Sequence, residues 1–375
     1  MAERVKRVAA ELGLPRIIIL GFFVLLVVAA GFFRMDLPQL FIDCLKRWGL
    51  FGILTLAMVP AVQCGIGLNF GITMGIVGGL LGGLIVIEFQ WARLPVLMAI
   101  HPLLAQWVGI LLAMAIGVGL SLGIGWLYGQ LLNRVKGSEM TVTTYVGFSI
   151  IAFMNIMWTI LPFRSGTLIY PNAGEGLRNT ISLADSYSGI ISNTFAIGWS
   201  LEPTFQIGFG ADRNWQYVLP TGLLLFFFLM CFLVWLFMRS KTGIAMSAAG
   251  ANPQFARASG INVNKMRLIG TVASTLLAAV GILVYAQGFG FMQLYNGPQM
   301  MGFNSVAAVL IGGATPRRAR ISHVLLGTLL FQSILSLALP VANMVIPEGN
   351  LSEVMRMIIA NGIILYALSQ TREGR

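Results

Sequence analysis

Apolar segments about twenty residues long recur along this 375-residue chain, and short polar stretches separate them. A helix needs roughly 20 apolar residues to cross the hydrocarbon core of a bilayer. Charged residues make up only 10% of the chain, against about 25% in a soluble domain. The pattern therefore predicts an all-α, polytopic membrane protein that forms a single transmembrane domain over residues 1–375, with no room for a separate soluble domain.

Ten transmembrane helices are expected. The first follows a basic N-terminal stretch that resembles a signal peptide, but its apolar run is long and further spans follow, so we expect an uncleaved helix. Residues 89–105 contain Pro95 and Pro102 and are too short to cross twice, which places them at the outer interface. The expected spans are residues 16–33, 48–66, 72–88, 106–132, 141–162, 215–238, 267–286, 302–315, 322–340 and 352–369.

The basic residues are distributed unevenly between these spans. With the N-terminus in the cytoplasm, 16 of the 24 Lys and Arg residues fall on the inner side with four of the 13 acids. The inner side then carries a net charge of +12 and the outer side −1. Positive charge is retained on the cytoplasmic side of membrane proteins. The sequence therefore predicts that both termini are cytoplasmic, and it gives no reason to invoke nucleic acid.

The residues that most often build catalytic or metal sites are sparse. The cysteines, Cys44, Cys64 and Cys231, are widely spaced and form no C-x-x-C pair, and the two histidines, His101 and His323, lie far apart. A disulfide framework or zinc site needs closer spacing, and a membrane enzyme needs convergent catalytic groups. We therefore expect no catalytic residue and no metal in this chain.

Two loops are unusually long. Residues 163–214 form an outer loop rich in Ser, Asn, Gly and aromatic residues. A loop of that length normally has its own structure or function. Residues 239–266 form the longest inner loop.

Glycine is concentrated at residues 65–83, where it occupies 8 of 19 positions. Small residues at four-residue spacing, as in Gly75, Gly79 and Gly83, favour close helix packing in lipid. Gly65, Gly67 and Gly71, around Asn69, instead favour a helix break. Unwound backbone at membrane depth is tolerated where protein or a water-filled cavity satisfies it.

A second interrupted element is expected at residues 302–315, which are too short for a full span. The sequence NGPQMMG precedes it at residues 296–302. If residues 48–162 and 267–369 are two halves, the interruptions occupy matching places and the halves run in opposite directions. Matched, interrupted segments in inverted repeats indicate a transporter's translocation path.

The inner loop contains signals for one short helix. Asn252 can act as the N-cap, Pro253 suits the first helical position, and Gly260 can end the helix in the left-handed conformation. The result is a helix of about seven residues, roughly 10 Å long, that carries Phe255 and Arg257. Such a helix could dock into a partner's groove, or it could simply turn the chain.

At this point the sequence resembles a known family. The runs GIAMSAAGANPQFARASGINVNKMR and FNSVAAVLIGGATPRRARISHVLLGTLL are similar to segments of the permeases of ATP-binding-cassette (ABC) importers. These permeases serve ribose, xylose and galactose, branched-chain amino acids, and nucleosides. The resemblance covers residues 48–369 and is strongest over 239–330.

The resemblance implies a set of partners in a bacterial inner membrane. These are a second permease, identical or related, two cytoplasmic ABC ATPase subunits, and an external substrate-binding protein. The chain has no Walker A motif, so ATP and Mg²⁺ are expected on the partner ATPase, with no cofactor and no enzyme activity in this chain. ATPase coupling is assigned to Gly250, Asn252, Pro253, Phe255, Ala256, Arg257 and Gly260.

The substrate implied is a small polar solute. The acid that sugar permeases carry near the helix break is missing from residues 65–71. Residues 137–144 and the long outer loop resemble the nucleoside type, and the ending from residue 303 onward resembles the sugar type. A sugar or nucleoside is favoured, and branched-chain amino acids or an autoinducer are the alternatives. Candidate path residues are Asn69, Thr73, Asn155 and Asn304, although each asparagine could equally form a helix–helix hydrogen bond.

An ion-coupled secondary transporter is the alternative from another class. Such proteins keep an acid or histidine inside the membrane for coupling. Glu88 is the nearest candidate, at the outer end of its predicted span.

Overall fold

The computed structural model describes residues 14–169, 176–200, 206–209 and 215–345, together with residues 354, 358, 361 and 362. The described chain is mostly helical. Within it, six helices are long and apolar enough to cross a membrane, or seven if a pair bent by 43° at residues 89–90 counts as one span. The polytopic helical class is confirmed. The expected tenth span, residues 352–369, lies almost entirely outside the described residues.

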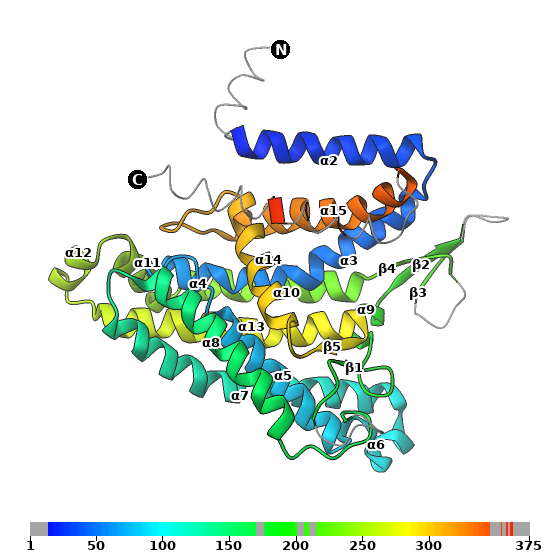
Figure 1. Cartoon of the computed structure of the whole chain (residues 1–375), viewed down its shortest axis with the longest axis horizontal. Coiled ribbons are helices and arrows are strands. Elements are labelled where there is room, and N and C mark those ends of the chain that lie inside the picture. Colours follow the sequence, from blue (N-terminus) through cyan, green and yellow to red (C-terminus); the bar gives the residue numbers. More distant parts are fainter. Residues whose placement is uncertain are drawn as a thin grey trace, which may run out of the picture.

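The helices gather into one elongated body (Figure 1). At one end of it, which we call the α12 end, lie the short helices α11 and α12 and the turn between α7 and α8; at the opposite β end lie the strands (Figure 1). The long helices are α2 (Leu14–Phe32), α3 (Leu37–Leu56), α5 (Ile72–Glu88), α7 (Pro102–Arg134), α8 (Glu139–Ile160), α10 (Thr221–Arg239), α13 (Val263–Phe289), α14 (Gly297–Ile311) and α15 (Ile321–Val345). The short helices are α4 (Met58–Gln63), η1 (Trp91–Arg93), α6 (Pro95–Ile100), α9 (Ile190–Asn193), α11 (Lys241–Ala251) and α12 (Pro253–Ala258).

Helices α5, α7 and α13 form the tightly packed centre, and glycine makes their close approach possible. A Cβ added to Gly82 of α5 would lie 2.5 Å from the backbone nitrogen of Gly117 on α7. A Cβ on Gly75 would lie 2.2 Å from the carbonyl oxygen of Thr275 on α13, and one on Gly79 would meet the backbone of Ala279. The packing prediction for Gly75 and Gly79 is therefore confirmed.

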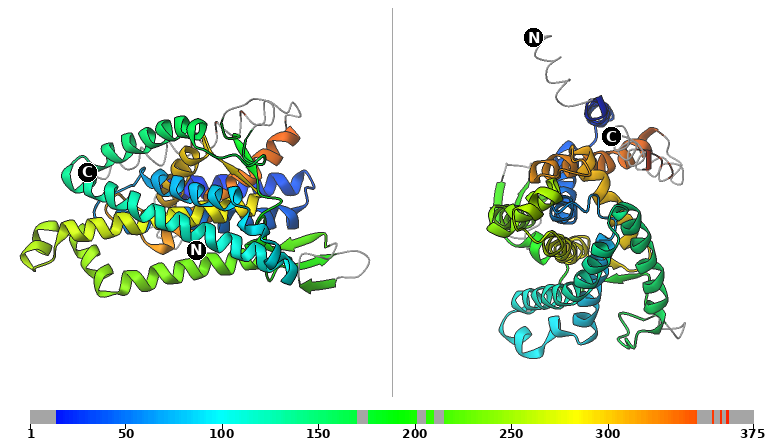
Figure 2. Two further views of the ribbon diagram at one scale, coloured as in Figure 1. Left: turned by 90° about the horizontal axis from the view of Figure 1, so that it is seen from below. Right: turned by 90° about the vertical axis from the view of Figure 1, so that its left-hand side faces the viewer.

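A second layer is built from α3, α15 and α2. The Trp48 indole of α3 donates a 3.0 Å hydrogen bond to the Leu325 carbonyl of α15. Helix α2 adds Leu26 and Ala30 to a buried apolar cluster with Phe331 and Ile334 of α15. In the right-hand view of Figure 2, α2 lies end-on at the edge of the body beside α15.

The predicted outer loop, residues 163–214, contains β-structure, so the all-α prediction is wrong for this part of the chain. Strand β1 (Thr180–Ser182) pairs antiparallel with β5 (Phe291–Gln293), and β2 (Ile197–Ser200) lies between β3 (Gln206–Phe209) and β4 (Tyr217–Leu219). These short segments carry aromatic and β-branched residues, which fit a pleated, half-buried surface. Because β4 occupies residues 217–219, α10 begins at Thr221, six residues after the predicted start of that span.

Other boundaries also differ from the prediction, most of all at α3, which begins at Leu37, eleven residues before the predicted start of its span. Helix α7 begins at Pro102, because His101 Nδ1 caps it by accepting a hydrogen bond from the Leu103 amide at 3.2 Å. Helix α14 begins at Gly297, five residues before the predicted start, and ends at Ile311. Its 15 residues extend about 22 Å, which is less than the roughly 30 Å hydrocarbon thickness of a bilayer.

Candidate functional site

The span that begins with α3 is interrupted between α4 and α5. Gly65 and Gly67 have φ angles of +83° and +87°, a region that favours glycine because it lacks a Cβ. A helix cannot continue through these angles, so the predicted break is confirmed. A Cβ on Gly65 would lie 2.9 Å from the Cα of Gly250, at the end of α11. The break therefore packs directly against the inner loop.

Asn69 lies inside the break and is fully buried. Its Oδ1 accepts a 2.6 Å hydrogen bond from the Tyr128 hydroxyl of α7, and its Nδ2 donates to Ser274 Oγ of α13 at 3.2 Å. These contacts match the alternative role given for this asparagine, which is to hydrogen-bond neighbouring helices to each other. The asparagine attaches the unwound segment to two helices of the central core.

Thr73, just beyond the break, lines a small cavity between α5, α8 and α14. The cavity is narrow, with room for about one water molecule, and it is lined by Phe70, Thr73, Thr144, Gly147, Phe148, Ile151, Gln299, Gly302 and Phe303. The Phe303 ring packs on Phe70 and Phe148 with centroid distances of 5.4 and 5.9 Å. Aromatic rings and a few hydroxyl and amide groups therefore converge where the two interrupted elements meet.

The other two candidate path residues lie outside this lining. Asn155 of α8 is half-buried, and its Oδ1 has no hydrogen-bond partner within the part of the chain that the structure describes. Asn304 of α14 is half-buried and follows Phe303. Of the four candidates, the structure brings only Thr73 into the cavity, and a role in transport stays a prediction for all four.

The predicted short helix of the inner loop is present as α12. The Asn252 side chain caps it by accepting hydrogen bonds from the Gln254 and Phe255 amides at 3.1 and 3.0 Å. Pro253 is its first residue. After the helix, Gly260 has a φ of +80°. The capping prediction is therefore confirmed at both ends.

Helix α12 is fixed on one side and open on the other. Ala256 is buried in a cluster with Cys64, Met246 and Met266. Phe255 is 67% exposed, and Arg257 is also exposed. The helix thus presents an aromatic group and a cation while its back is attached to the broken span.

Helix α11, which precedes α12, was missed by the sequence prediction. Ser240 caps it by accepting a hydrogen bond from the Gly243 amide at 3.2 Å. It places Gly250 so close to the break that an added Cβ would lie 2.2 Å from the Gln63 carbonyl oxygen. The capping serine and the alanine-rich run after it were the available signal.

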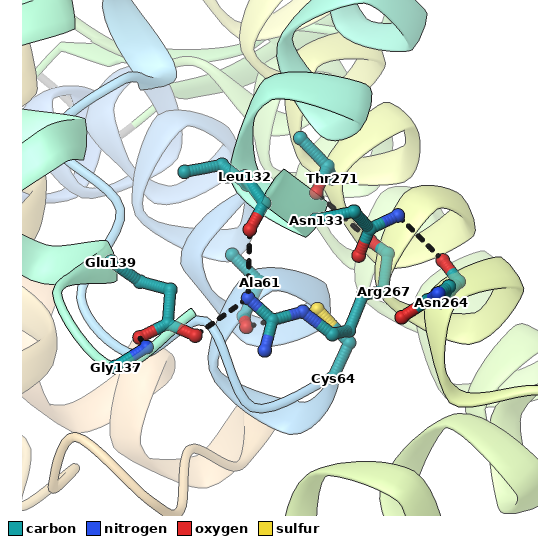
Figure 3. Close-up of polar contacts among 9 residues, drawn as sticks. All are labelled: Ala61, Cys64, Leu132, Asn133, Gly137, Glu139, Asn264, Arg267 and Thr271. Atoms are coloured by element: carbon teal, nitrogen blue, oxygen red, sulfur yellow. Dashed lines mark hydrogen bonds and ion pairs between the residues drawn. The ribbon is translucent and has the colours of Figure 1, made fainter. Parts of the chain in front are cut away.

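A buried ion pair was also missed. Arg267, in the second turn of α13, lies 2.7 Å from Glu139 in the first turn of α8, and the two side chains are 9% and 15% exposed. Arg267 also donates to the Leu132 carbonyl at 3.2 Å, and Glu139 accepts from the Gly137 amide at 2.9 Å. Figure 3 shows this cluster between the α7–α8 turn and the start of α13.

Glu88, the candidate for ion coupling, lies at the β end of α5. Its two carboxylate oxygens accept hydrogen bonds from the backbone amides of Arg164 and Ser165 at 2.9 and 3.0 Å. The carboxylate therefore anchors the start of the outer loop. The structure gives it a positioning contact at the end of its helix.

Apolar helices of bilayer-crossing length, an unwound segment at their centre and a short helix that stops within the bilayer thickness define a polytopic membrane protein of the transporter class. Residues 40–368 match the family model described as the branched-chain amino acid transport system, permease component. The chain belongs to this family.

Curated relatives match over shorter stretches. The chain is 25% identical over 172 residues to the nucleoside ABC transporter permease protein NupB of Lactococcus lactis subsp. cremoris, covering 45% of this chain and 44% of NupB. It is 34% identical over 96 residues to NupC, a nucleoside ABC transporter permease protein of the same organism, covering 26% and 30%. The Probable ABC transporter permease protein YphD of Escherichia coli is 35% identical over 120 residues, covering 32% and 35%. The chain thus spans less than half the length of each relative, and no solved structure matches it significantly.

Proposed function

We propose that this chain is the membrane-spanning permease subunit of an ABC importer that guides a small polar solute across the membrane. The observation that carries the proposal is the contact between the inner loop and the broken span. Helix α12 presents Phe255 and Arg257 to solvent, while Gly250 just before it packs against Gly65 in the break. A movement imposed on α12 by a partner would reach the interrupted span directly.

The ten-helix arrangement with two inverted halves is part of the proposal. Helices α3, α14 and α15 would correspond to α13, α5 and α7. Helix α3 packs on α15 as α13 packs on α7, α14 packs on α15 as α5 packs on α7, and α3 contacts α13. Glycine mediates the contact in both halves, with Gly312 against Gly327 and Gly82 against Gly117. The tenth helix would be formed by residues 352–369.

The α12 end would face the bacterial cytoplasm, with both chain termini on that side. Several cations of the described chain gather at this end, on α7, α10, α11, α12 and the turn after α7, and positive residues are retained on the cytoplasmic side. They include Arg134, Lys136, Arg239, Lys241 and Arg257. The strands would then lie on the outer side, where they could receive a binding protein.

The solute would pass beside α8. The cavity lined by Thr73 and Phe303 reaches the surface there, since Phe148 is 41% exposed. A continuous path along this face needs a second wall, which a second permease, identical or related, would supply. Cytoplasmic ABC ATPases would bind and hydrolyse ATP with Mg²⁺, and this chain would perform no catalysis itself.

A sugar or nucleoside is the solute we favour. Two relatives are described as nucleoside permeases. The cavity lining carries aromatic rings and the polar groups of Thr73, Thr144 and Gln299, which would face a nucleobase once the cavity widens. The family description keeps branched-chain amino acids as a second candidate. Uptake of labelled nucleosides, sugars and leucine by the assembled transporter separates these possibilities.

Copurification tests the proposal. The tagged chain is extracted gently from its native membrane, and bound proteins are identified by mass spectrometry. An ATPase with a Walker motif should copurify with the parent chain and be lost with Phe255→Ala or Arg257→Glu. The matched control is Ile207→Ala, because Ile207 is 60% exposed at the opposite end of the molecule. A parent chain that captures no ATPase, while taking up solute under an ion gradient without ATP, would overturn the proposal.

A further inference from the structure

Helix α8 is the least buried of the helices that could cross the membrane among the described residues. In its most apolar stretch of 18 residues, only 22% is buried inside the protein, against 78% for the span Leu37–Gln63 and 67% for α13. Yet α8 supplies Thr144, Gly147 and Phe148 to the cavity wall. A sparsely packed helix can move at a lower cost in lost contacts than the central core can.

The α12 end of α8 is held to the rest of the protein by a specific polar contact. Glu139, in its first turn, is paired with Arg267 at 2.7 Å, and both side chains are almost completely buried. Arg267 lies only nine residues after the end of α12, and α13 runs straight from Val263 through it. The ion pair therefore joins the helix that follows α12 to the helix that lines the cavity.

Burial makes this connection hard to break. A charge that loses its partner inside a protein keeps its full desolvation cost, so separating Glu139 from Arg267 is costly. Arg267 also holds the Leu132 carbonyl near the end of α7, and Glu139 holds the Gly137 amide (Figure 3). The whole α7–α8 turn is thus attached to the start of α13.

We propose that the Glu139–Arg267 ion pair transmits the movement of α12 to α8 and so to the cavity wall. This inference rests on the proposed function, because it takes an ATPase as the source of the movement. Glu139 and Arg267 are positioning residues: they touch neither solute nor ATP, and they keep α8 in step with α13. Losing the pair uncouples hydrolysis from transport while the complex still assembles.

The experiment uses the complete copurified transporter in proteoliposomes. A nitroxide at Tyr145→Cys reports on α8, since Tyr145 is 68% exposed and the three native cysteines are buried. We compare the parent with Glu139→Gln, with Arg267→Lys, and with the double exchange Glu139→Arg plus Arg267→Glu. The readouts are ATP hydrolysis, solute uptake, and the change in nitroxide mobility between the nucleotide-free and vanadate-trapped states.

In Glu139→Gln, uptake per ATP hydrolysed should fall roughly fivefold or more, as for substitutions that alter coupling between sites, and the nitroxide change should disappear. Arg267→Lys keeps the positive charge, so it should retain most of the uptake per ATP hydrolysed and most of the nitroxide change. The double exchange should recover part of the uptake. The matched control is Asp185→Asn, which removes the exposed Arg93–Asp185 pair at the β end. This variant should leave the ratio of solute uptake to ATP hydrolysis unchanged.

An assembled Glu139→Gln complex with an unchanged nitroxide response and an unchanged ratio would overturn the inference. If Glu139→Gln does not assemble, Arg267→Lys and the double exchange decide. Both keep an opposite-charge pair at these positions, so assembled complexes of both variants that have lost coupling would overturn the inference. Failure of the proposed function looks different, because no ATPase then copurifies with the parent chain.

Discussion

The Tyr128 hydroxyl of α7 donates a 2.6 Å hydrogen bond to Asn69 Oδ1, in the unwound segment between α4 and α5. Both residues are buried. The bond satisfies a polar group that water cannot reach, so the break is held by α7 as well as by its own glycines. In this conformation Asn69 therefore stabilises the unwound segment.

Replacing Tyr128 with phenylalanine should destabilise the protein. The change leaves Asn69 Oδ1 without the donor that it has here, and a buried unsatisfied acceptor costs about 1–3 kcal/mol, with values near 1 kcal/mol typical inside membranes. Thermal unfolding in detergent measures the loss. Tyr187→Phe is the matched control: Tyr187 is fully buried, and its hydroxyl has no hydrogen-bond partner among residues that the structure describes.

The control has a definite expected outcome. Burial raises the pKa of the Tyr187 phenol, so the group stays neutral at physiological pH, and removing its hydroxyl should leave stability unchanged or raise it. Equal losses for the two substitutions would show that the Tyr128–Asn69 bond contributes nothing specific.

Glycines at the contact between α5 and α7 should tolerate alanine far less well than glycines elsewhere on α7. A Cβ on Gly82 would lie 2.6 Å from the Ala113 carbonyl oxygen of α7, and one on Gly117 would lie 3.0 Å from the Cα of Gly79. Gly82→Ala and Gly117→Ala should therefore lower the free energy of unfolding by about 1–3 kcal/mol, as overpacking does. A titration of unfolding with denaturing detergent measures it.

Gly119 and Gly123 provide the comparison on the same helix. Nothing lies within 4 Å of a Cβ built on either residue. Their alanine variants should be neutral or more stable by about 0.5–1 kcal/mol, because alanine favours a helix over glycine. Large losses at these two positions would mean that another surface covers this face of α7.

Removing the N-cap of α12 should weaken ATPase binding, although the exposed side chains of Phe255 and Arg257 are left unchanged. Asn252→Ala removes the acceptor for the Gln254 and Phe255 amides, and such caps stabilise a helix by about 1 kcal/mol. Faster hydrogen exchange at these amides and less copurified ATPase are the expected results. Asn252→Asp, which can still cap, should behave as the parent does, and equal capture by both variants would separate the cap from docking.

Shortening Phe303 should open the cavity. Its ring packs on Phe70 and Phe148, and truncating it to alanine removes the side chain that joins them. We expect solute to leak through the assembled transporter without ATP, measured as efflux of labelled solute from proteoliposomes. Phe153→Ala is the control, because Phe153 is 53% exposed on the same helix as Phe148. An equal leak from both variants would argue against a constriction at Phe303.

Much of this architecture could be predicted because local rules determine it. Apolar length predicts α7, α8 and α13, and the order of Asn252, Pro253 and Gly260 predicts where α12 begins and ends. The pairing of β1 with β5 depends on contacts between Thr180–Ser182 and Phe291–Gln293, which are distant in sequence. Periodicity carries no information on such pairs.

The Glu139–Arg267 pair shows the same limit at the candidate site. The two residues are 128 positions apart, and each reads as an ordinary charge at the end of a span. Their burial becomes evident only once α8 and α13 are folded together. Thr73, by contrast, could be predicted as a candidate from the sequence, because it lies two residues after Gly71 in the glycine-rich segment.

The attachment of α2 to α15 has a consequence for biogenesis. Leu26 and Ala30 find their apolar partners at Phe331 and Ile334, roughly 300 residues later. Ribosomes add about 5–20 residues per second, so α2 waits some 15–60 s in the bilayer before α15 emerges. During that interval lipid or the insertion machinery must shield it, and the helix that enters the membrane early is among the last to reach its final neighbour.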